Sequence, residues 1–348
     1  MTEIPVSADL LTSLIEALFE SLGLNREGSA LLADSLISAD LEGISSHGVA
    51  LVPMYVQRVR SGSVSVDALP RIVEDHGALV VMSAAHTFGQ ISSQVAMKEV
   101  VERARQHGVA VIAVRDAFHF GTAAYWARKP AEIGMIGFAF SNTRPLMPAL
   151  GGAERVVGNN PMAIAFPAES GAPLVVDMAM SATAMGKIRL AQARGQSIPE
   201  GWATDSEGRP TTAPVDAING MLLPAAGPKG FGLAVAVDLL CGALSGGAIG
   251  SAVRPLYGTL DEPYNCSHTF IAIDASRLGN HVGIADQVAS FAEAIRSSRK
   301  APGTDRIYAP GDLERSRRTQ SSGKCLLLPQ LIAELNGLAD QAEIQHRI

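Results

Sequence analysis

The stretch Gly43-Ile44-Ser45-Ser46-His47-Gly48-Val49 separates two apolar runs of helical spacing, and Pro53 and Tyr55 follow it closely. Glycine lets a backbone turn sharply and approach a ligand. A histidine beside a serine can be held in one tautomer and transfer a proton near neutral pH. On spacing alone the pattern favours a helix-turn-helix corner with a capping serine and a solvated histidine, because serine and glycine are common at helix ends.

Amphipathic helices are predicted on both sides of this turn. Apolar residues recur at helical spacing over 7–22, where Ser7 is the expected N-cap and Gly23 ends the run. A second helix is predicted from Asn25, and a third over 49–59. The start of the chain is therefore a small helical unit.

After residue 70 the pattern changes to short strands that alternate with helices. The continuous apolar run 109–114 has the length and character of a buried strand. Further strands are predicted over 71–74, 78–82, 135–140, 163–166, 174–177 and 268–274. Helices are predicted over 87–107, 121–133, 183–193, 231–244, 282–299 and 329–335, the last ended by Gly337. We expect long loops over 195–215 and 246–266, and the least order over 311–324.

These elements predict an α/β protein of two domains. We expect a helical domain over 1–70, completed by 305–348, and an α/β domain over 71–304. The 348 residues are 47% hydrophobic, which suffices for a large core. The formal charge of −6 comes without a basic cluster, so we expect no nucleic-acid partner.

Several classes of site and location are not expected. The three cysteines are scattered, so neither a disulfide framework nor a structural zinc is indicated, and no metal site is predicted. The N-terminus lacks a secretory pattern, and no apolar run reaches the roughly 18 residues of a membrane span. We therefore expect a soluble, cytoplasmic protein that does not bind membranes. No GxGxxG follows a predicted strand, and no P-loop or GxSxG is present.

Three other stretches place polar residues where strands pass to helices. In Asp116–Ala123 the strand 109–114 is followed by His119 at a helix N-terminus, where free N–H groups suit a phosphate or carboxylate. Alternatively, His119 only caps the helix or packs against its start. Ser141–Pro145 places Arg144 after the next strand, as a bidentate carboxylate binder or a solvated loop residue. Lys229 begins a further helix and is weak evidence alone.

Short motifs along almost the whole chain identify a family. They are Ala39–Gly43 with Ser46–Val49, His119–Gly121, Gly151–Gly152, Gly158–Ala163, Asp177–Ala179, Gly186–Ile188, Ile198–Ala203, Leu223–Pro224, Lys229–Gly230 and Ile307–Gly311. Together they resemble the malate/L-lactate dehydrogenase-like family. That family also holds ureidoglycolate dehydrogenase, L-sulfolactate dehydrogenase, diketogulonate reductase and Δ1-piperideine-2-carboxylate/Δ1-pyrroline-2-carboxylate reductase.

The resemblance implies a nicotinamide-dependent oxidoreductase, commonly a homodimer, with a non-Rossmann mixed-sheet nucleotide-binding domain. It implies that His47 donates a proton, with Ser46 orienting or relaying, while hydride adds to C2 of a 2-oxo or 2-imino acid. One branch assigns the acid/base role to the position of His119, so both histidines stay candidates. The cofactor, NAD or NADP, would contact His119, Phe120, Gly121, Thr122, Ala123, Asp177, Met178, Ala179, Lys229, Gly230 and Arg306.

Two positions depart from the family pattern. The arginine that commonly follows the motif histidine by four residues is replaced by Leu51, and an aspartate of the imine-reductase relay is replaced by Lys187. We predict that Arg144 holds the substrate carboxylate instead. Tyr55, Thr143 and Asn159 are the other predicted substrate-binding residues.

The departures also bear on the substrate. An apolar wall at Leu51 slightly favours a cyclic 2-imino acid over a 2-oxo acid in an NAD(P)H-dependent reductase. The alternative is an NAD-dependent dehydrogenase of a 2-hydroxy acid such as malate, lactate or ureidoglycolate. A catalytically inactive binding homologue is disfavoured by Ser46, His47, His119 and Lys229.

Overall fold

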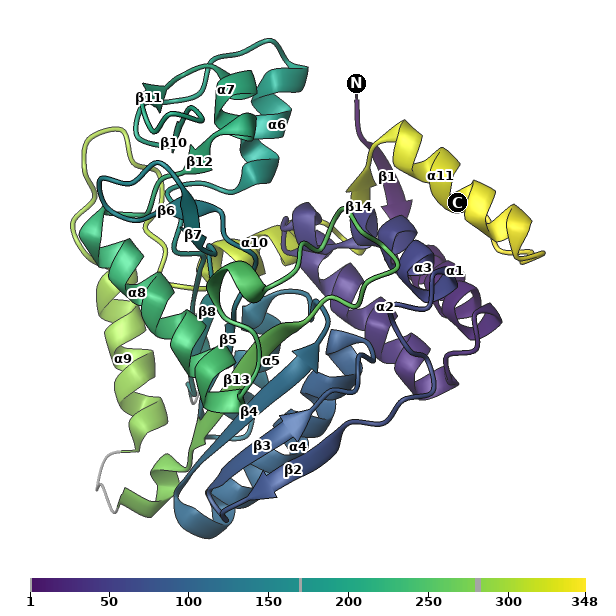
Figure 1. Cartoon of the computed structure of the whole chain (residues 1–348). Coiled ribbons are helices and arrows are strands. Elements are labelled where there is room, and N and C mark those ends of the chain that lie inside the picture. Colours follow the sequence, from purple (N-terminus) through teal and green to yellow (C-terminus); the bar gives the residue numbers. More distant parts are fainter. Residues whose placement is uncertain (1, 169–170, 279–282) are drawn as a thin grey trace.

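A mixed seven-stranded sheet forms the centre of the protein in a computed structural model that describes residues 2–168, 171–278 and 283–348 (Figure 1). Only the β3·β4 pair is parallel among its hydrogen-bonded neighbours. The strand order is β2 (Arg71–Asp75), β3 (Leu79–Ser83), β4 (Val109–Ala117), β13 (Cys266–Ile273), β5 (Ile136–Ser141), β8 (Met162–Phe166) and β9 (Leu174–Met178). The predicted strands are all present, and a strand from late in the chain lies between β4 and β5.

Helices cover both faces of this sheet because its strands alternate between two cores. Ala139 and Phe270 face a core that includes helices α4 (Gly89–His107) and α5 (Ala123–Glu132). Phe138, Phe140 and Ile271 pack against the opposite side. There α8 (Pro228–Asp238) continues into a π-helical turn over Leu239–Ala243, and α9 (Ile284–Arg296) lies nearby in Figure 1. The predicted start of α9 at Val282 lies outside the described residues.

The two ends of the chain meet in one helical unit. Strand β1 (Ile4–Ser7) pairs antiparallel with β14 (Lys324–Leu327), and α11 (Pro329–Gln341) contacts α1 (Ala8–Ser21) and α3 (Val52–Arg60). Helix α2 (Arg26–Leu41) begins at Asn25, whose side chain accepts a hydrogen bond from Gly28 N. Ser7 precedes α1 but makes no capping bond with its side chain. The exact domain boundaries remain predictions.

A smaller unit, whose helices and β10–β12 lie at the top of Figure 1, has a core of Met147, Ile188, Ala217 and other apolar residues that extends to Ala234 of α8. It contains β6 (Met147–Pro148), β7 (Arg155–Val157), α6 (Met185–Ala193), β10 (Ala203–Thr204), β11 (Pro210–Thr211), α7 (Pro214–Asn219) and β12 (Met221–Leu222). The expected loop over 195–215 therefore contains two short strands that pair antiparallel. Single 3-10 turns lie at Gly250–Ala252 and Ala275–Leu278.

Two expectations about the C-terminal region are wrong. The segment 311–324, expected to be the least ordered, contains helix α10 (Asp312–Gln320). The Asp312 carboxylate accepts hydrogen bonds from Ala309 N and from Arg296, which fixes the start of this polar helix. Gly337 does not end the last helix, which runs on to Gln341, because the apolar residues Leu338 and Ala339 still pack into the core.

Candidate active site

Asp40 fixes the turn that carries His47. After α2, Gly43 takes a positive φ of 76°, and Ser45–His47 form a 3-10 turn. The Asp40 carboxylate then accepts a 2.7 Å hydrogen bond from Val49 N. A Cβ atom at Gly48 would lie 2.3 Å from that carboxylate, so only glycine fits there. The glycines and the histidine of this motif are thus parts of one tight corner.

The His119 loop approaches the same corner from the sheet. It follows β4 and precedes α5, and the start of α4 presses against it: a Cβ at Gly89 would lie 2.2 Å from Phe118 O and 2.4 Å from His119 O. The rings of His47 and His119 lie 5.3 Å apart between centroids. The structure therefore brings together the two histidines that the sequence left as alternatives.

Each imidazole has a hydroxyl partner on its Nδ1 atom. Ser46 Oγ lies 2.9 Å from Nδ1 of His47, and the Tyr55 hydroxyl lies 2.7 Å from Nδ1 of His119. Gln90 Nε2 donates to the Tyr55 oxygen at 3.4 Å. Tyr55 is fully buried behind His119, so its predicted contact with substrate remains a prediction.

Both histidines are neutral at pH 7 in this environment. Burial lowers the pKa of His47 to about 4. The pKa of His119 lies well below its usual range because of burial, and the neighbouring His47 and His268 lower it further. Burial raises the pKa of the Tyr55 hydroxyl, which therefore stays protonated and can donate to His119.

His268, which sequence reasoning missed, supports the His119 loop from β13. It is fully buried, its Nε2 lies 3.0 Å from Phe118 O, and its ring stacks 4.3 Å from that of Phe120. Its Nδ1 lies 3.0 Å from Ser141 Oγ. No local motif marks this histidine, because its partners lie more than 100 residues earlier in the chain.

A cavity of about 740 Å³ opens beside α5 and contains part of the predicted cofactor set. Asp177 lines it and accepts a 3.3 Å hydrogen bond from Ala124 N, which follows Thr122 and Ala123 at the helix start. Burial raises the pKa of Asp177 to about 6. Arg128, Lys129, Arg315 and Arg318 also line this cavity.

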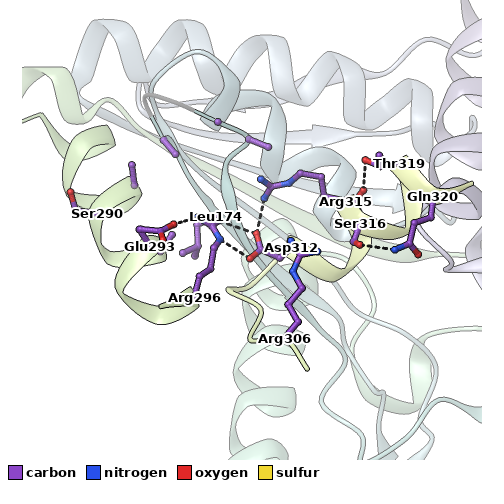
Figure 2. Close-up of a pocket in the computed structure, with 15 residues that line it drawn as sticks. Leu174, Ser290, Glu293, Arg296, Arg306, Asp312, Arg315, Ser316, Thr319 and Gln320 are labelled. Carbon is purple, nitrogen blue, oxygen red and sulfur yellow. Dashed lines mark hydrogen bonds and ion pairs between the residues drawn. The ribbon is translucent and has the colours of Figure 1, made fainter. Parts of the chain in front are cut away.

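Of the predicted cofactor residues, Asp177 lines this cavity, and the others lie outside its lining. A Cβ at Gly230 would lie 2.9 Å from Met180 O, so the start of α8 with Lys229 packs directly after Met178 and Ala179. Arg306 lines a second cavity of about 960 Å³, drawn in Figure 2. The two cavities share Ala172 and Arg315, and the Arg306 guanidinium lies 5.1 Å over the ring of Tyr308, which lines the first.

The predicted substrate-binding residues after β5 form a second polar group. Thr143 Oγ1 donates to Asn159 Oδ1 at 3.0 Å, and Asn160, which sequence reasoning did not single out, accepts from Thr143 N at 2.9 Å. Arg144 is partly buried and has no carboxylate partner among the described residues; burial and the nearby Arg155 lower its pKa. Leu51 is 3% exposed and packs in the main core. It is therefore not an open wall of a substrate pocket.

Arg58, also missed from sequence, organises the loop next to this region. Its side chain is fully buried and donates to five backbone carbonyls, those of Pro255, Leu256, Thr259, Leu260 and Glu262. Tyr264 follows this loop, and its ring lies 6.1 Å from that of Phe118. One turn of α3 thus carries both Tyr55, which contacts His119, and Arg58, which holds the loop over 255–262.

Comparisons with known proteins agree in one family. The family model described as malate/L-lactate dehydrogenase matches residues 6–336. Malate dehydrogenase of Pyrococcus abyssi is 34% identical and aligns over 98% of this chain and 95% of its own length. The NAD(+)-named ureidoglycolate dehydrogenase of Escherichia coli K12 is 34% identical (88% and 87% covered). The NADP(+)-named (2R)-3-sulfolactate dehydrogenase of Chromohalobacter salexigens is 33% identical (92% and 94% covered).

Solved structures give the same result. The sulfolactate dehydrogenase of Methanocaldococcus jannaschii superposes with a TM-score of 0.92 at 31% identity, with 98% of each chain covered. The Δ1-piperideine-2-carboxylate reductase of Pseudomonas syringae gives a TM-score of 0.86 at 28% identity, with 97% of this chain and 100% of that chain covered.

Proposed function

This chain belongs to the malate/L-lactate dehydrogenase family and is an NAD(P)-dependent oxidoreductase, and from that premise we propose that it reduces a 2-oxo acid or a cyclic 2-imino acid at C2. The observation that carries the proposal is the pair of neutral imidazoles 5.3 Å apart, each with a hydroxyl on Nδ1. Such a pair can present two Nε2 atoms to one carbonyl or imine.

The cavity beside α5 suits a nicotinamide cofactor. Apolar residues of its lining, such as Val175 and Leu313, offer surfaces to flat rings. Basic and acidic side chains both line it, and Arg128 and Arg318 pair with Glu42, so Lys129 is the cation that we propose for the pyrophosphate. Asp177, Ala179, Lys229 and Gly230 would hold the nicotinamide half, next to the His119 loop. The bound cofactor supplies the hydride that adds to C2.

His47 is the proposed proton donor. When Ser46 Oγ–H donates to Nδ1, the proton of the neutral imidazole is on Nε2, the atom that Ser46 leaves free. As the Nε2 proton passes to the developing alkoxide or amine, Nδ1 takes the proton of Ser46 Oγ, and Ser46, which is exposed, takes a proton from solvent, so that His47 stays neutral throughout. His119, held by Tyr55 in the same tautomer, donates a hydrogen bond to the reacting group.

Arg144 is the proposed carboxylate ligand of the substrate. A buried carboxylate needs a cation or several donors, and Arg144 is partly buried with no carboxylate partner among the described residues. Thr143 and Asn159, which are joined to each other, complete the polar side of the site.

The 2-oxo acid is the first substrate class to test. Leu51 does not favour an imine, because its side chain lies in the core. Relatives named as malate and sulfolactate dehydrogenases support the 2-oxo and 2-hydroxy acid pair, which is the same chemistry in reverse. Cyclic 2-imino acids should also be tested, because the similar structure from Pseudomonas syringae is a Δ1-piperideine-2-carboxylate reductase.

The test is a substrate screen with the purified protein. NADH and NADPH oxidation would be followed with pyruvate, oxaloacetate, sulfopyruvate, Δ1-pyrroline-2-carboxylate and Δ1-piperideine-2-carboxylate. Turnover of at least one, lost in the His47→Ala variant, supports the proposal. Tight cofactor binding without turnover of any 2-oxo or 2-imino acid contradicts it.

We also propose a homodimer located in the cytoplasm. Exposed leucines on α8 and its π-helical turn support the dimer: Leu233, Leu239, Leu240 and Leu244 are 46%, 48%, 40% and 38% exposed. A surface of this kind usually marks an interface. Among the described residues, no helix is long and apolar enough to span a membrane.

A further inference from the structure

The second cavity has an excess of positive charge that its own acids do not neutralise. The described charged residues lining it are three arginines, Arg296, Arg306 and Arg315, and two acids, Glu293 and Asp312. Figure 2 shows Asp312 between Arg296 and Arg315, with Arg306 separate from them. The cavity is therefore suited to an anion at Arg306.

Both acids are already engaged by arginines. Arg296 donates to the two oxygens of Asp312 at 2.8 and 2.9 Å and lies 3.6 Å from Glu293. Asp312 also accepts from Arg315 at 3.3 Å and from Ala309 N at 2.9 Å. The Asp312 carboxylate is therefore fully occupied and cannot also accept from the 2′- and 3′-hydroxyls of an NAD ribose, whereas Glu293 is mostly exposed and held only by the longer contact to Arg296.

Arg306 has the opposite character. It forms no ion pair among the described residues, and its guanidinium lies 5.1 Å over the Tyr308 ring. A guanidinium held against an aromatic face keeps its edge free for two parallel hydrogen bonds to a phosphate. Tyr308 lines the α5 cavity and Arg306 lines the second cavity, so the two side chains lie at the boundary between the two cavities.

We propose that the second cavity takes the adenosine end of the cofactor, and that Arg306 binds the 2′-phosphate of NADP(H). The chain therefore prefers NADPH to NADH. This inference rests on the proposed function, because only a dinucleotide in the α5 cavity would bring an adenosine ribose to Arg306.

Fluorescence titration of the intact protein with NADPH and with NADH tests the preference. We expect NADPH to bind at least about ten times more tightly, and Arg306→Gln to weaken NADPH about ten- to a hundred-fold, the range of one charge-assisted pair, while NADH changes little. Arg299→Gln is the matched control, since it removes the same charge from an exposed arginine that does not line the cavity. Competition by adenosine 2′,5′-bisphosphate and by 5′-AMP should show the same difference without the nicotinamide half.

Three results would overturn the inference. They are equal or tighter binding of NADH by the unmodified protein, equal loss of both cofactors in Arg306→Gln, and an equal effect of Arg299→Gln. If NADH binds and supports turnover without any preference for NADPH, the proposal that Arg306 binds a 2′-phosphate is wrong, and the proposed function is still supported. If neither cofactor binds, both fail.

Discussion

The Asp40 carboxylate and the backbone N–H of Val49 are joined by a 2.7 Å hydrogen bond that encloses Gly48. This bond ties the end of α2 to the residue two positions after His47. Burial raises the pKa of Asp40 to about 6, and the hydrogen bond from Val49 opposes that shift. The turn that carries His47 is therefore held by the Asp40 carboxyl group, whose pKa is raised.

Asp40→Asn should remove a pH dependence of stability while keeping the turn. The folded-state pKa of Asp40, about 6, lies above its ordinary value of 3.8. Its contribution to stability is therefore complete below pH 4 and is lost as the pH rises to about 6. Asparagine keeps an acceptor for Val49 N and does not titrate. Urea unfolding across pH 3.5–7 should give a difference between the two proteins that changes between pH 4 and 6; parallel curves would exclude Asp40 as the cause.

His47→Ala should lower kcat by about 10²- to 10⁴-fold, the usual contribution of a general acid. Cofactor affinity should stay nearly unchanged, because the cavity residues near Asp177 do not include His47. Steady-state kinetics and cofactor titration check both parts. Activity within a few-fold of the unmodified protein, together with a large loss in His119→Ala, would transfer the proton-donor role to His119.

Gly121→Ala should weaken cofactor binding measurably. Gly121 has a φ of +83°, and a Cβ there would lie 2.9 Å from Ser35 Oγ, so either the Ser35 side chain or the His119 loop must move. Gly134→Ala is the control: its φ is +87°, but a Cβ there meets nothing within 4 Å. Both variants lose stability through backbone strain, whereas only Gly121→Ala should raise the Kd for NAD(P)H. An unchanged Kd would move the cofactor away from this loop.

Arg144→Ala should reduce kcat/KM about ten- to a hundred-fold if this side chain binds the substrate carboxylate. Arg144→Lys should recover only part of the loss, because an ammonium lacks the planar fork of donors. Arg209→Ala removes a charge from an exposed arginine in the smaller unit and should leave kcat/KM unchanged. Full activity of Arg144→Ala would leave the carboxylate to Thr143 and Asn159.

Leu240→Asp should turn a dimer into a monomer, since it places a charge among the exposed leucines of α8 and the π-helical turn that follows it. Light scattering after size exclusion should give about half the mass of the unmodified protein. Leu69→Asp, at a leucine that is 77% exposed elsewhere, should leave the mass unchanged. A monomeric unmodified protein would contradict the dimer directly.

Local patterns predicted the elements whose causes are local. The apolar run 109–114 became the buried strand β4, Asn25 capped α2, and Gly108 followed α4 with a φ of +88°. The glycine-framed His47 turn and the His119 loop were also visible, because each needs particular residues within a few positions. That the two histidines lie side by side could not be predicted from either stretch alone, because it depends on how the two loops meet in the folded protein.

Features that depend on distant partners were not predictable. β13 lies between β4 and β5 although it comes about 150 residues after β4, and His268 reaches Phe118 only through that pairing. Helix α10 has a strongly polar sequence that resembles a disordered segment; its first residue is fixed by Arg296 from another helix. The contact of Tyr55 with His119 joins residues 64 positions apart and could not be seen in the sequence either.

The five carbonyls gathered by Arg58 have a consequence for how this enzyme can diversify. Backbone oxygens are the same in every amino acid, so the shape of the loop over 255–262 is specified mainly by a residue outside it. The loop side chains, Tyr257 among them, are left free to change without loss of that shape. A library that randomises exposed positions of this loop while keeping Arg58 should therefore retain the fold in most of its members.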